Sequence, residues 1–199
     1  MLSKEDSIRK QLIKEAAYRL FNQFGFHKTS LEDIANNAGI SKQSLYYYYP
    51  NKEAIFNEIV LETAQKILND IDQKIDTNLP ADEKFLLFTQ SIYESIKNHA
   101  REIGPVVTPD FIEYSPHGRP IVDKIRYLFK DKLRAILIEG KKQDIFSMED
   151  EEMTLNALME MANFIRIRWL IFQDEKLCDQ IVKEMNRIVL FGLKVRKDQ

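Results

Sequence analysis

One short segment carries side chains whose types and spacing could do chemistry, and that chemistry is binding rather than catalysis. Residues 41–48 read SKQSLYYY and combine hydroxyls, one ammonium group and one amide. Hydroxyls, cations and helix N-terminal N–H groups suit phosphates, and the Gln43 amide can form a bidentate pair with adenine. This set predicts a surface that reads duplex DNA, with Gln43 as the best candidate for base contact. Simpler roles stay open, because Ser41 can be only a helix cap and Tyr46 can belong to a packed aromatic face.

Local signals indicate two short helices that would position these side chains. Ser30 offers an N-cap with acidic residues in the first turn, and apolar residues then recur three and four positions apart at Leu31, Ile34, Ala35 and Ala38. Gly39 can leave the helix at positive φ, and Ser41 caps a second helix that Pro50 ends. Two short helices joined by a glycine-containing turn predict a helix-turn-helix.

A supporting helix is expected before this pair. Apolar residues recur every four positions at Ile8, Leu12, Ala16, Leu20 and Phe24, with Ile13, Ala17 and Phe21 beside them. This pattern predicts an amphipathic helix that ends at Gly25. Lys4, Arg9, Lys10 and Lys14 are expected on its exposed start. They are interpreted as a solvated face, with phosphate contact as the alternative.

The string from about Ile8 to Val60 resembles the N-terminal domain of the TetR (tetracycline repressor) family of bacterial transcription regulators. The residues that carry this resemblance recur at fixed spacing and are Ala16, Leu20, Phe21, Gly25, Phe26, Thr29, Ile34, Ala35, Gly39, Ile40, Ser41, Leu45, Tyr46, Tyr47, Lys52 and Glu53. Two positions depart from the family pattern. Tyr49 stands where phenylalanine is usual, and Gln43, which lies where bases are read, stands where a small residue is frequent.

The resemblance implies DNA contacts at the matching positions, which are Thr29, Ser30, Ser41, Lys42, Gln43, Ser44, Tyr46, Tyr47 and Lys52. Tyr48 joins them because its hydroxyl could reach phosphate while its ring packs on sugar or a thymine methyl. Leu45 and Tyr49 are expected in the core. One such module binds weakly, so two copies about 34–36 Å apart on a palindromic operator are expected.

The remainder of the chain also favours helices, so the predicted fold is all-α with about nine helices. It comprises a three-helix helix-turn-helix domain over residues 1–60 and a larger ligand-binding and dimerisation domain over residues 61–199. A helix of about 24 residues from Lys52 would link the two domains. Displacing the far end of this helix would therefore rotate the helix-turn-helix domain. A proline-rich stretch from Gly104 to Pro120 predicts one short helix over 108–114. A long helix closed by Gly140 follows, and then a helix over 151–173 after a capping box at 147–150.

The last two helices predict a homodimer. The helix over 151–173 is apolar on two opposite sides, which requires cover on both. The final helix carries additional apolar residues such as Phe191. Two such helices from each of two chains would form an isologous four-helix interface.

A mostly apolar cavity for a small-molecule effector is predicted in the second domain from residue type and place. Its candidate lining residues are Phe88, Ile92, His99, Phe111, Tyr114, Tyr127, Met159, Phe164, Arg166, Arg168 and Trp169. For the aromatic residues and His99, ordinary core packing is the alternative. Arg166 and Arg168 lie among apolar neighbours and need a partner, which is either a carboxylate of the protein or an anionic ligand.

The composition permits a DNA-binding protein, and it disfavours a disulfide-bonded, metal-binding or membrane-spanning protein. The chain has 199 residues and a net charge of −2, and residues 1–60 hold eight Lys and Arg against seven Asp and Glu. DNA affinity must therefore come from a few well-placed cations. The single cysteine excludes an intramolecular disulfide, and we expect no cofactor, metal site, signal peptide or membrane span, which favours the cytoplasm.

The sequence thus predicts a dimeric DNA-binding regulator, a repressor released from its operator by an effector. An enzyme is disfavoured because no phosphate-binding glycine loop, nucleophile elbow or His-Glu metal helix occurs. The remaining alternative is a nucleoid-associated or cell-division factor whose helical body binds a protein.

Overall fold

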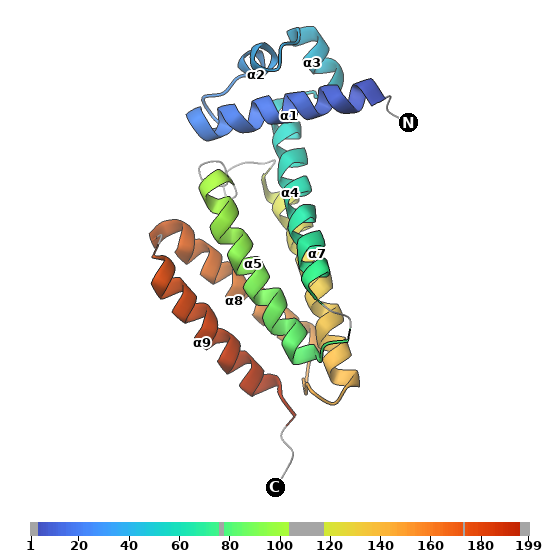
Figure 1. Ribbon diagram of the computed structural model, residues 1–199, viewed down its shortest axis with the longest axis vertical. Coiled ribbons are helices and arrows are strands. Elements are labelled where there is room, and N and C mark those ends of the chain that lie inside the picture. The colour runs from blue at the N-terminus through green and yellow to red at the C-terminus, as the bar shows by residue number, and fades with distance from the viewer. Residues whose placement is uncertain (1–3, 76–77, 104–117, 173, 196–199) are drawn as a thin grey trace. The chain divides into compact units, whose positions relative to one another are not determined.

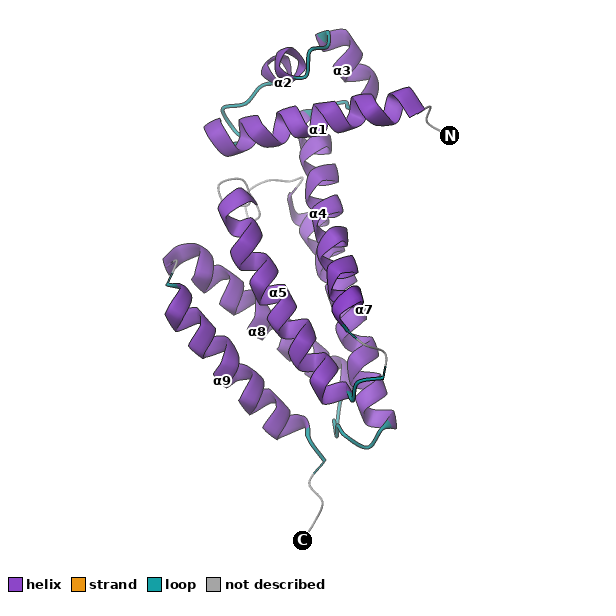
Figure 2. Ribbon diagram, in the orientation of Figure 1, coloured by secondary structure: helices purple, strands orange, loops and turns teal. Residues whose placement is uncertain are grey.

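The computed structural model describes residues 4–75, 78–103, 118–172 and 174–195, and it describes their side chains except at 96–103, 118–119, 163–172 and 175. These residues form eight helices and one isolated bridge between Phe146 and Lys194, which confirms the all-α prediction (Figures 1 and 2). The helices are α1 (Lys4–Phe24), α2 (Leu31–Asn37), α3 (Lys42–Tyr48), α4 (Lys52–Lys74), α5 (Ala81–Ile103), α7 (Gly118–Lys142), α8 (Glu151–Phe172) and α9 (Glu175–Leu193). The short helix predicted over 108–114 lies outside the described residues.

The chain divides into two compact units, so α4, α5 and α7 each contribute to both. One unit comprises Met1–Gln65 and Arg101–Asp123, and the other comprises Lys66–Ala100 and Lys124–Gln199. In the described residues no helix is long and apolar enough to span a bilayer.

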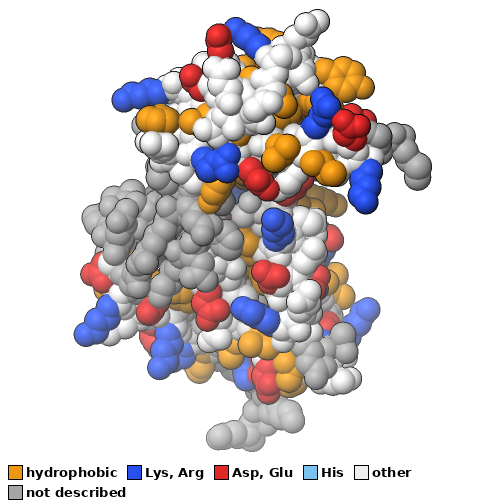
Figure 3. Space-filling view, turned by 45° about the horizontal axis from the view of Figure 1, so that its top comes forward, with side chains coloured by type: hydrophobic (Ala, Val, Ile, Leu, Met, Phe, Trp, Pro, Cys, Tyr) orange, Lys and Arg blue, Asp and Glu red, His pale blue; other side chains and the backbone are white. Residues whose placement is uncertain are grey.

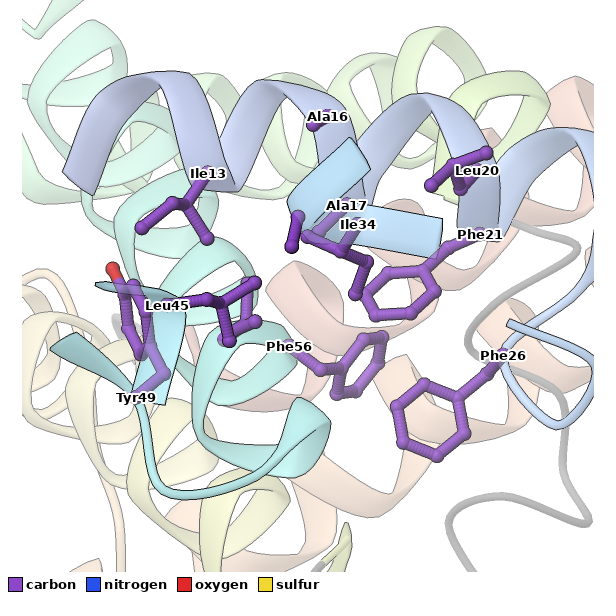
Figure 4. Close-up of a cluster of buried hydrophobic side chains, with 12 residues drawn as sticks. Ile13, Ala16, Ala17, Leu20, Phe21, Phe26, Ile34, Leu45, Tyr49 and Phe56 are labelled. Atoms are coloured by element: carbon purple, nitrogen blue, oxygen red, sulfur yellow. The ribbon is translucent and has the colours of Figure 1, made fainter. Parts of the chain in front are cut away.

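The first unit is organised around a core that α1, α2, α3 and the start of α4 share. Figure 4 shows Ile13, Ile34 and Leu45 converging from three different helices, and all three are fully buried. The rings of Phe21 and Phe26 lie 5.2 Å apart between centroids and extend this core toward the start of α2. Burying a side chain such as Leu45 stabilises the fold by about 1.5–3 kcal/mol.

The buried face of α1 agrees only in part with the predicted one. Its buried apolar residues are five of those predicted, Ile13, Ala16, Ala17, Leu20 and Phe21, whereas Ile8, Leu12 and Phe24 are about half exposed. A step of four residues advances 400° around a helix, so a row of such steps drifts by about 40° each time. Over the four steps from Ile8 to Phe24 the row leaves the core side, whereas alternating steps of three and four remain on it.

Lys14 was expected on a solvated face, and that expectation is wrong. Its side chain is only 10% exposed, and its ammonium group pairs with Glu62 and, at 3.5 Å, with Glu58 on α4. Lys10 also pairs with Glu58 at 3.3 Å, whereas Arg9 stays near solvent. Burial of an ammonium group requires such partners, and these lie more than 40 residues away in the sequence.

The second unit is closed at one end by the segment between α7 and α8. Phe146 is 2% exposed and packs edge-on against Phe85 of α5, with the ring centroids 6.5 Å apart. The backbone N–H of Ser147 donates to the Leu193 carbonyl at 2.7 Å, which ties this segment to the end of α9.

The ends of the helices in this unit differ in detail from those predicted. Gly140 does not end α7, which continues to Lys142; the positive φ of 54° falls at Asp144. Gly140 instead leaves room for the Phe146 ring, since a Cβ atom there would lie 2.0 Å from Phe146 Cδ2. The N-cap of α8 is Asp150, whose carboxylate accepts from the Met153 N–H at 2.9 Å.

Candidate nucleic-acid interface

The first helix of the predicted pair is held by a reciprocal cap. The Ser30 hydroxyl accepts from the Asp33 N–H at 3.1 Å, and the Asp33 carboxylate accepts from the Ser30 N–H at 2.9 Å. The Ser30 hydroxyl, which donates to the Asp33 carboxylate at 2.6 Å, and then the Ser30 N–H hold the pKa of Asp33 below its usual value. Because α2 has only seven residues, satisfying its first N–H groups is a large part of what fixes where it begins.

The turn between α2 and α3 needs a glycine. Gly39 has a φ of 68°, a backbone conformation that costs a residue with a Cβ atom, and the Ile40 N–H closes the turn on the Ala35 carbonyl at 3.0 Å. Figure 1 shows α2 and α3 on the same side of α1. The turn therefore sets the angle between the two short helices.

One side of α3 is anchored in the core, as predicted. Leu45 is fully buried and Tyr49, just past the end of the helix, is 2% exposed. The Ser41 hydroxyl accepts from the Ser44 N–H at 3.1 Å and so caps the helix. A seven-residue helix with a buried anchor and a satisfied N-terminus is held in one orientation.

The other side of α3 faces solvent and carries the groups suited to DNA. Lys42 and Gln43 are exposed in the first turn, Tyr46 is 50% exposed and Tyr47 is 76% exposed. The exposed side of α3 thus presents one ammonium, one amide and two phenol groups together.

Lys42 pairs with Glu32 of α2, an acidic residue that is not among the predicted DNA-binding residues. The two charged groups lie 3.0 Å apart and both are exposed. The hydrogen bond to Glu32, together with its charge, raises the pKa of Lys42. The predicted turn between the helices brings these residues close, so their opposite charges ten positions apart were a usable signal.

Tyr48 has a different setting from its neighbours. It is half-buried, its hydroxyl donates to the Asp6 carboxylate of α1 at 3.0 Å, and its ring meets that of Tyr47 edge-on. Desolvation, followed by the bond to Asp6, raises the pKa of Tyr48. Asp6 lies 42 residues away, and no local pattern indicates that pairing.

Thr29 and Lys52 also turn toward the protein. Thr29 is 3% exposed, and its hydroxyl donates to the Gly25 carbonyl at 2.9 Å. The Lys52 ammonium donates to the carbonyls of Phe26, His27 and Thr29 at 2.8, 3.3 and 2.9 Å. The donors of both side chains are therefore used within the first unit.

No broad basic field accompanies these groups. In Figure 3 the Lys and Arg side chains are interspersed with Asp and Glu over the face that is drawn, rather than gathered into one patch. Nearly balanced charges agree with the sequence count for residues 1–60. Any affinity for nucleic acid must rest on few contacts.

The residues proposed to line an effector cavity are only partly described. Phe88 is buried in the core of the second unit, Ile92 and Met159 pack against that core, and Tyr127 is 63% exposed. The side chains of His99, Phe164, Arg166, Arg168 and Trp169 are not described, and Phe111 and Tyr114 lie outside the described residues.

A small cavity of about 130 Å³ in the second unit is lined by none of these residues. It lies beside Arg134, Leu137, Ile138, Met148, Glu151, Glu152 and Leu155. Glu152 pairs there with Lys130 at 2.5 Å and with Arg134 at 2.9 Å, and these hydrogen bonds lower the pKa of Glu152. The charged side chains that line this cavity are thus already paired, and the cavity is smaller than the usual ligand pocket of about 300–1,000 Å³. Over the described residues, no cluster of His, Cys, Asp and Glu could hold a metal ion.

Comparison with known proteins agrees with this geometry. Residues 13–59, which hold the core of the first unit and both short helices, match the family model described as "Bacterial regulatory proteins, tetR family". The HTH-type transcriptional regulator RutR of Escherichia coli is 52% identical over 54 residues, which cover 27% of this chain and 26% of RutR.

Two relatives match over most of their length. YhgD of Bacillus subtilis, an HTH-type transcriptional regulator, is 25% identical over 81% of this chain and 84% of its own. The HTH-type transcriptional repressor KstR2 of Rhodococcus jostii is 23% identical over 93% and 91%. Among solved structures, the fatty acid degradation regulator FadR from Bacillus halodurans has the same fold, with a TM-score of 0.75 at 19% identity over 94% of this chain and 97% of FadR.

Proposed function

Because the chain belongs to the TetR family of bacterial regulatory proteins, we propose that it is a DNA-binding transcriptional regulator that acts as a dimeric repressor. The observation that carries the proposal is the build of α3. Its buried side is locked by Leu45, while its exposed side presents Lys42, Gln43 and Tyr47. Of these, Lys42 pairs with Glu32 and the Tyr47 ring meets that of Tyr48. A helix of this size fits the major groove of B-DNA, which is about 12 Å wide.

The proposed contacts are of two kinds: contacts to phosphates, which position α3 on the DNA, and contacts to bases, which recognise the sequence. Ser41, Lys42 and Ser44, together with the helix N-terminal N–H groups, contact phosphates and set the register of α3. Gln43 reads a base edge, and Tyr46 and Tyr47 cover sugar and thymine methyl groups. Thr29, Ser30, Tyr48 and Lys52 were also predicted to contact DNA. They are left out of this contact set because their donors are engaged within the protein.

The second copy is proposed to bind through α9, with α8 beside it. Residues Leu177, Ile188 and Phe191 are 37%, 54% and 68% exposed, and at 100° per residue they fall with Ile181 on one stripe of the helix. The opposite side of α9, which includes Cys178, Val182 and Leu193, is already buried in its own unit. An exposed apolar stripe of this kind suits an isologous contact, and two helix-turn-helix domains then match a palindrome.

Release by a small-molecule effector is the proposed control. The effector would bind more tightly to a dimer conformation in which the spacing of the two helix-turn-helix domains does not match the operator. DNA affinity then falls by the difference between the effector's binding free energies for the two conformations. The candidate site is the helical second unit, with Arg166 or Arg168 as an anchor if the ligand is anionic. The proposed compartment is the cytoplasm, where the DNA is.

Selection of bound duplexes from random and genomic fragments tests this proposal directly. The expected result is an inverted repeat with half-sites one helical turn apart, followed by release in a screen of small molecules. Retention of no duplex above bulk competitor contradicts the DNA-binding role. Recovery of many dispersed sites, with a protein bound to the helical body, would instead favour a nucleoid-associated or cell-division factor.

A further inference from the structure

The turn between α1 and α2 exposes the carbonyl end of a helix without a cation of its own. The last turn of α1 contains no basic residue, and Gly25 leaves the helix at a φ of 85°. The final carbonyls of a helix carry partial negative charge and need donors. The turn that follows adds backbone carbonyls of its own, and whatever supplies donors to them decides how firmly the residues that lead into α2 are held.

Lys52 of α4 supplies donors to this turn, beyond the last residue of α1. Its ammonium group lies within hydrogen-bond distance of three carbonyls of this turn, those of Phe26, His27 and Thr29, and it sits 4.6 Å from the centre of the Phe26 ring. An ammonium group has three N–H donors, so three carbonyl partners leave none for another acceptor. The buried Thr29 hydroxyl adds a bond to the Gly25 carbonyl beside them.

The position of Lys52 in its own helix makes this role more specific. Lys52 is the first residue of α4, and a cation at a helix N-terminus is disfavoured by the helix dipole. The adjacent Asn51 caps α4 through a bond from the Ala54 N–H at 2.8 Å, so α4 does not need Lys52 in order to begin. The side chain therefore serves the α1–α2 turn rather than the helix that carries it.

We propose that Lys52 is a positioning residue, whose ammonium group holds the α1–α2 turn and thereby the N-terminus of α2 in place for binding DNA. This inference rests on the proposed function and adds that Lys52 supports DNA affinity without touching a phosphate. The residues it fixes include Thr29, which directly precedes the α2 cap Ser30. Loss of the ammonium group releases the turn and lowers affinity for every sequence.

The rival role, a salt bridge from Lys52 to phosphate, makes different predictions. Each phosphate contact contributes about 0.9 to the slope of log affinity against log salt concentration, so its loss makes the slope shallower by that amount. Arginine is an excellent phosphate ligand and would preserve such a contact. A planar guanidinium does not fit three convergent carbonyls, so arginine would not preserve the hold on the turn.

The test uses Lys52→Met, which keeps the stem without the charge, and Lys52→Arg, which keeps the charge. Lys28→Met is the matched control, because Lys28 is an exposed cation of the same turn. For each full-length variant, amide hydrogen exchange of residues 25–30 and thermal unfolding are measured without DNA. Affinity for the selected operator is then measured at several salt concentrations, at a temperature where every variant is folded.

The expected result is faster exchange over residues 25–30 in both Lys52 variants, with no change in the Lys28 variant. Operator affinity should fall about tenfold or more in both Lys52 variants, with the salt slope unchanged. Full affinity in Lys52→Arg, or a slope reduced by about 0.9 in Lys52→Met with normal exchange, overturns the proposal. If the wild type binds no duplex, the proposed function fails, while the exchange data still decide whether Lys52 holds the turn.

Discussion

On the exposed side of α3, base reading is proposed for Gln43 and phosphate contact for its neighbour Lys42. Gln43 has its amide at the surface, whereas Lys42 is tied to Glu32 at 3.0 Å. A bidentate pair between an amide and adenine distinguishes one base from the others, whereas an ammonium group at the DNA phosphate backbone does not. Substitutions at these positions should therefore change different properties of DNA binding.

Replacing Gln43 with alanine should relax preference at one base position of each half-site by about 1–3 kcal/mol. Affinity measured on duplexes that carry each of the four bases at each position checks this. Equal weakening on all duplexes would contradict a base-reading role for Gln43. Lys42→Ala is the contrast, because its effect should not depend on sequence.

Replacing Glu32 with glutamine should raise affinity for all DNA by a few-fold. The change removes a negative charge from the DNA-facing side and frees the Lys42 ammonium for phosphate, so the salt slope should steepen by up to about 0.9. Both partners are exposed, so unfolding should be almost unaffected. The gain should shrink in a Lys42→Met background; an equal gain there would mean that Glu32 acts independently of Lys42.

Among the helices, α3, like α2, depends strongly on its ends. It has seven residues, too few for stability by itself, so the Ser41 cap and the buried Leu45 hold it against the rest of the first unit. The same first turn is proposed to approach phosphate. Capping and DNA contact at Ser41 can be separated by choosing what replaces the hydroxyl.

Ser41→Ala should destabilise the first unit by about 0.5–2 kcal/mol, whereas Ser41→Asn and Ser41→Asp should keep the cap and the stability. Of the two capped variants, only Ser41→Asp should lose DNA affinity, because its carboxylate would face phosphates. Thermal unfolding and operator binding of the three variants check this. Normal binding by Ser41→Asp would place the N-terminus of α3 away from the DNA backbone.

At the scale of the whole molecule, the proposed DNA recognition depends on the pairing of two chains. The exposed stripe of α9 offers apolar area that its own unit does not cover, with Phe191 at 68% exposure as its most exposed member. Joining two weak modules raises their combined affinity by a factor of about 10²–10⁴. Loss of pairing should therefore cost far more DNA affinity than loss of any one contact.

Phe191→Glu should give a folded monomer, because this side chain contributes little to the core of its own unit. Sedimentation should show loss of the dimer, helix content should be unchanged, and operator affinity should fall at least about 100-fold. Lys183→Gln is the control, since it makes the same change in net charge on the same helix away from the stripe. A dimer that survives Phe191→Glu would place the interface elsewhere.

The sequence by itself determined the local structure, including most of the helix-turn-helix. The Ser30 and Ser41 caps, the positive φ of Gly39 and the burial of Leu45 and Tyr49 were all predicted and are found in the structure. These features depend on residues within one or two turns of one another. Their hydrogen bonds and steric limits are therefore legible in the order of the residues.

Only the tertiary structure decided what the long polar side chains do. Lys14 was expected in solvent and is buried against α4, Tyr48 bonds to Asp6, and Lys52 binds the α1–α2 turn. Each partner lies more than 20 residues away, and a flexible side chain of this length can reach solvent, phosphate or a carbonyl from the same backbone position. Which of these it meets is set by how the helices pack, because packing alone brings distant donors and acceptors within 3 Å of each other.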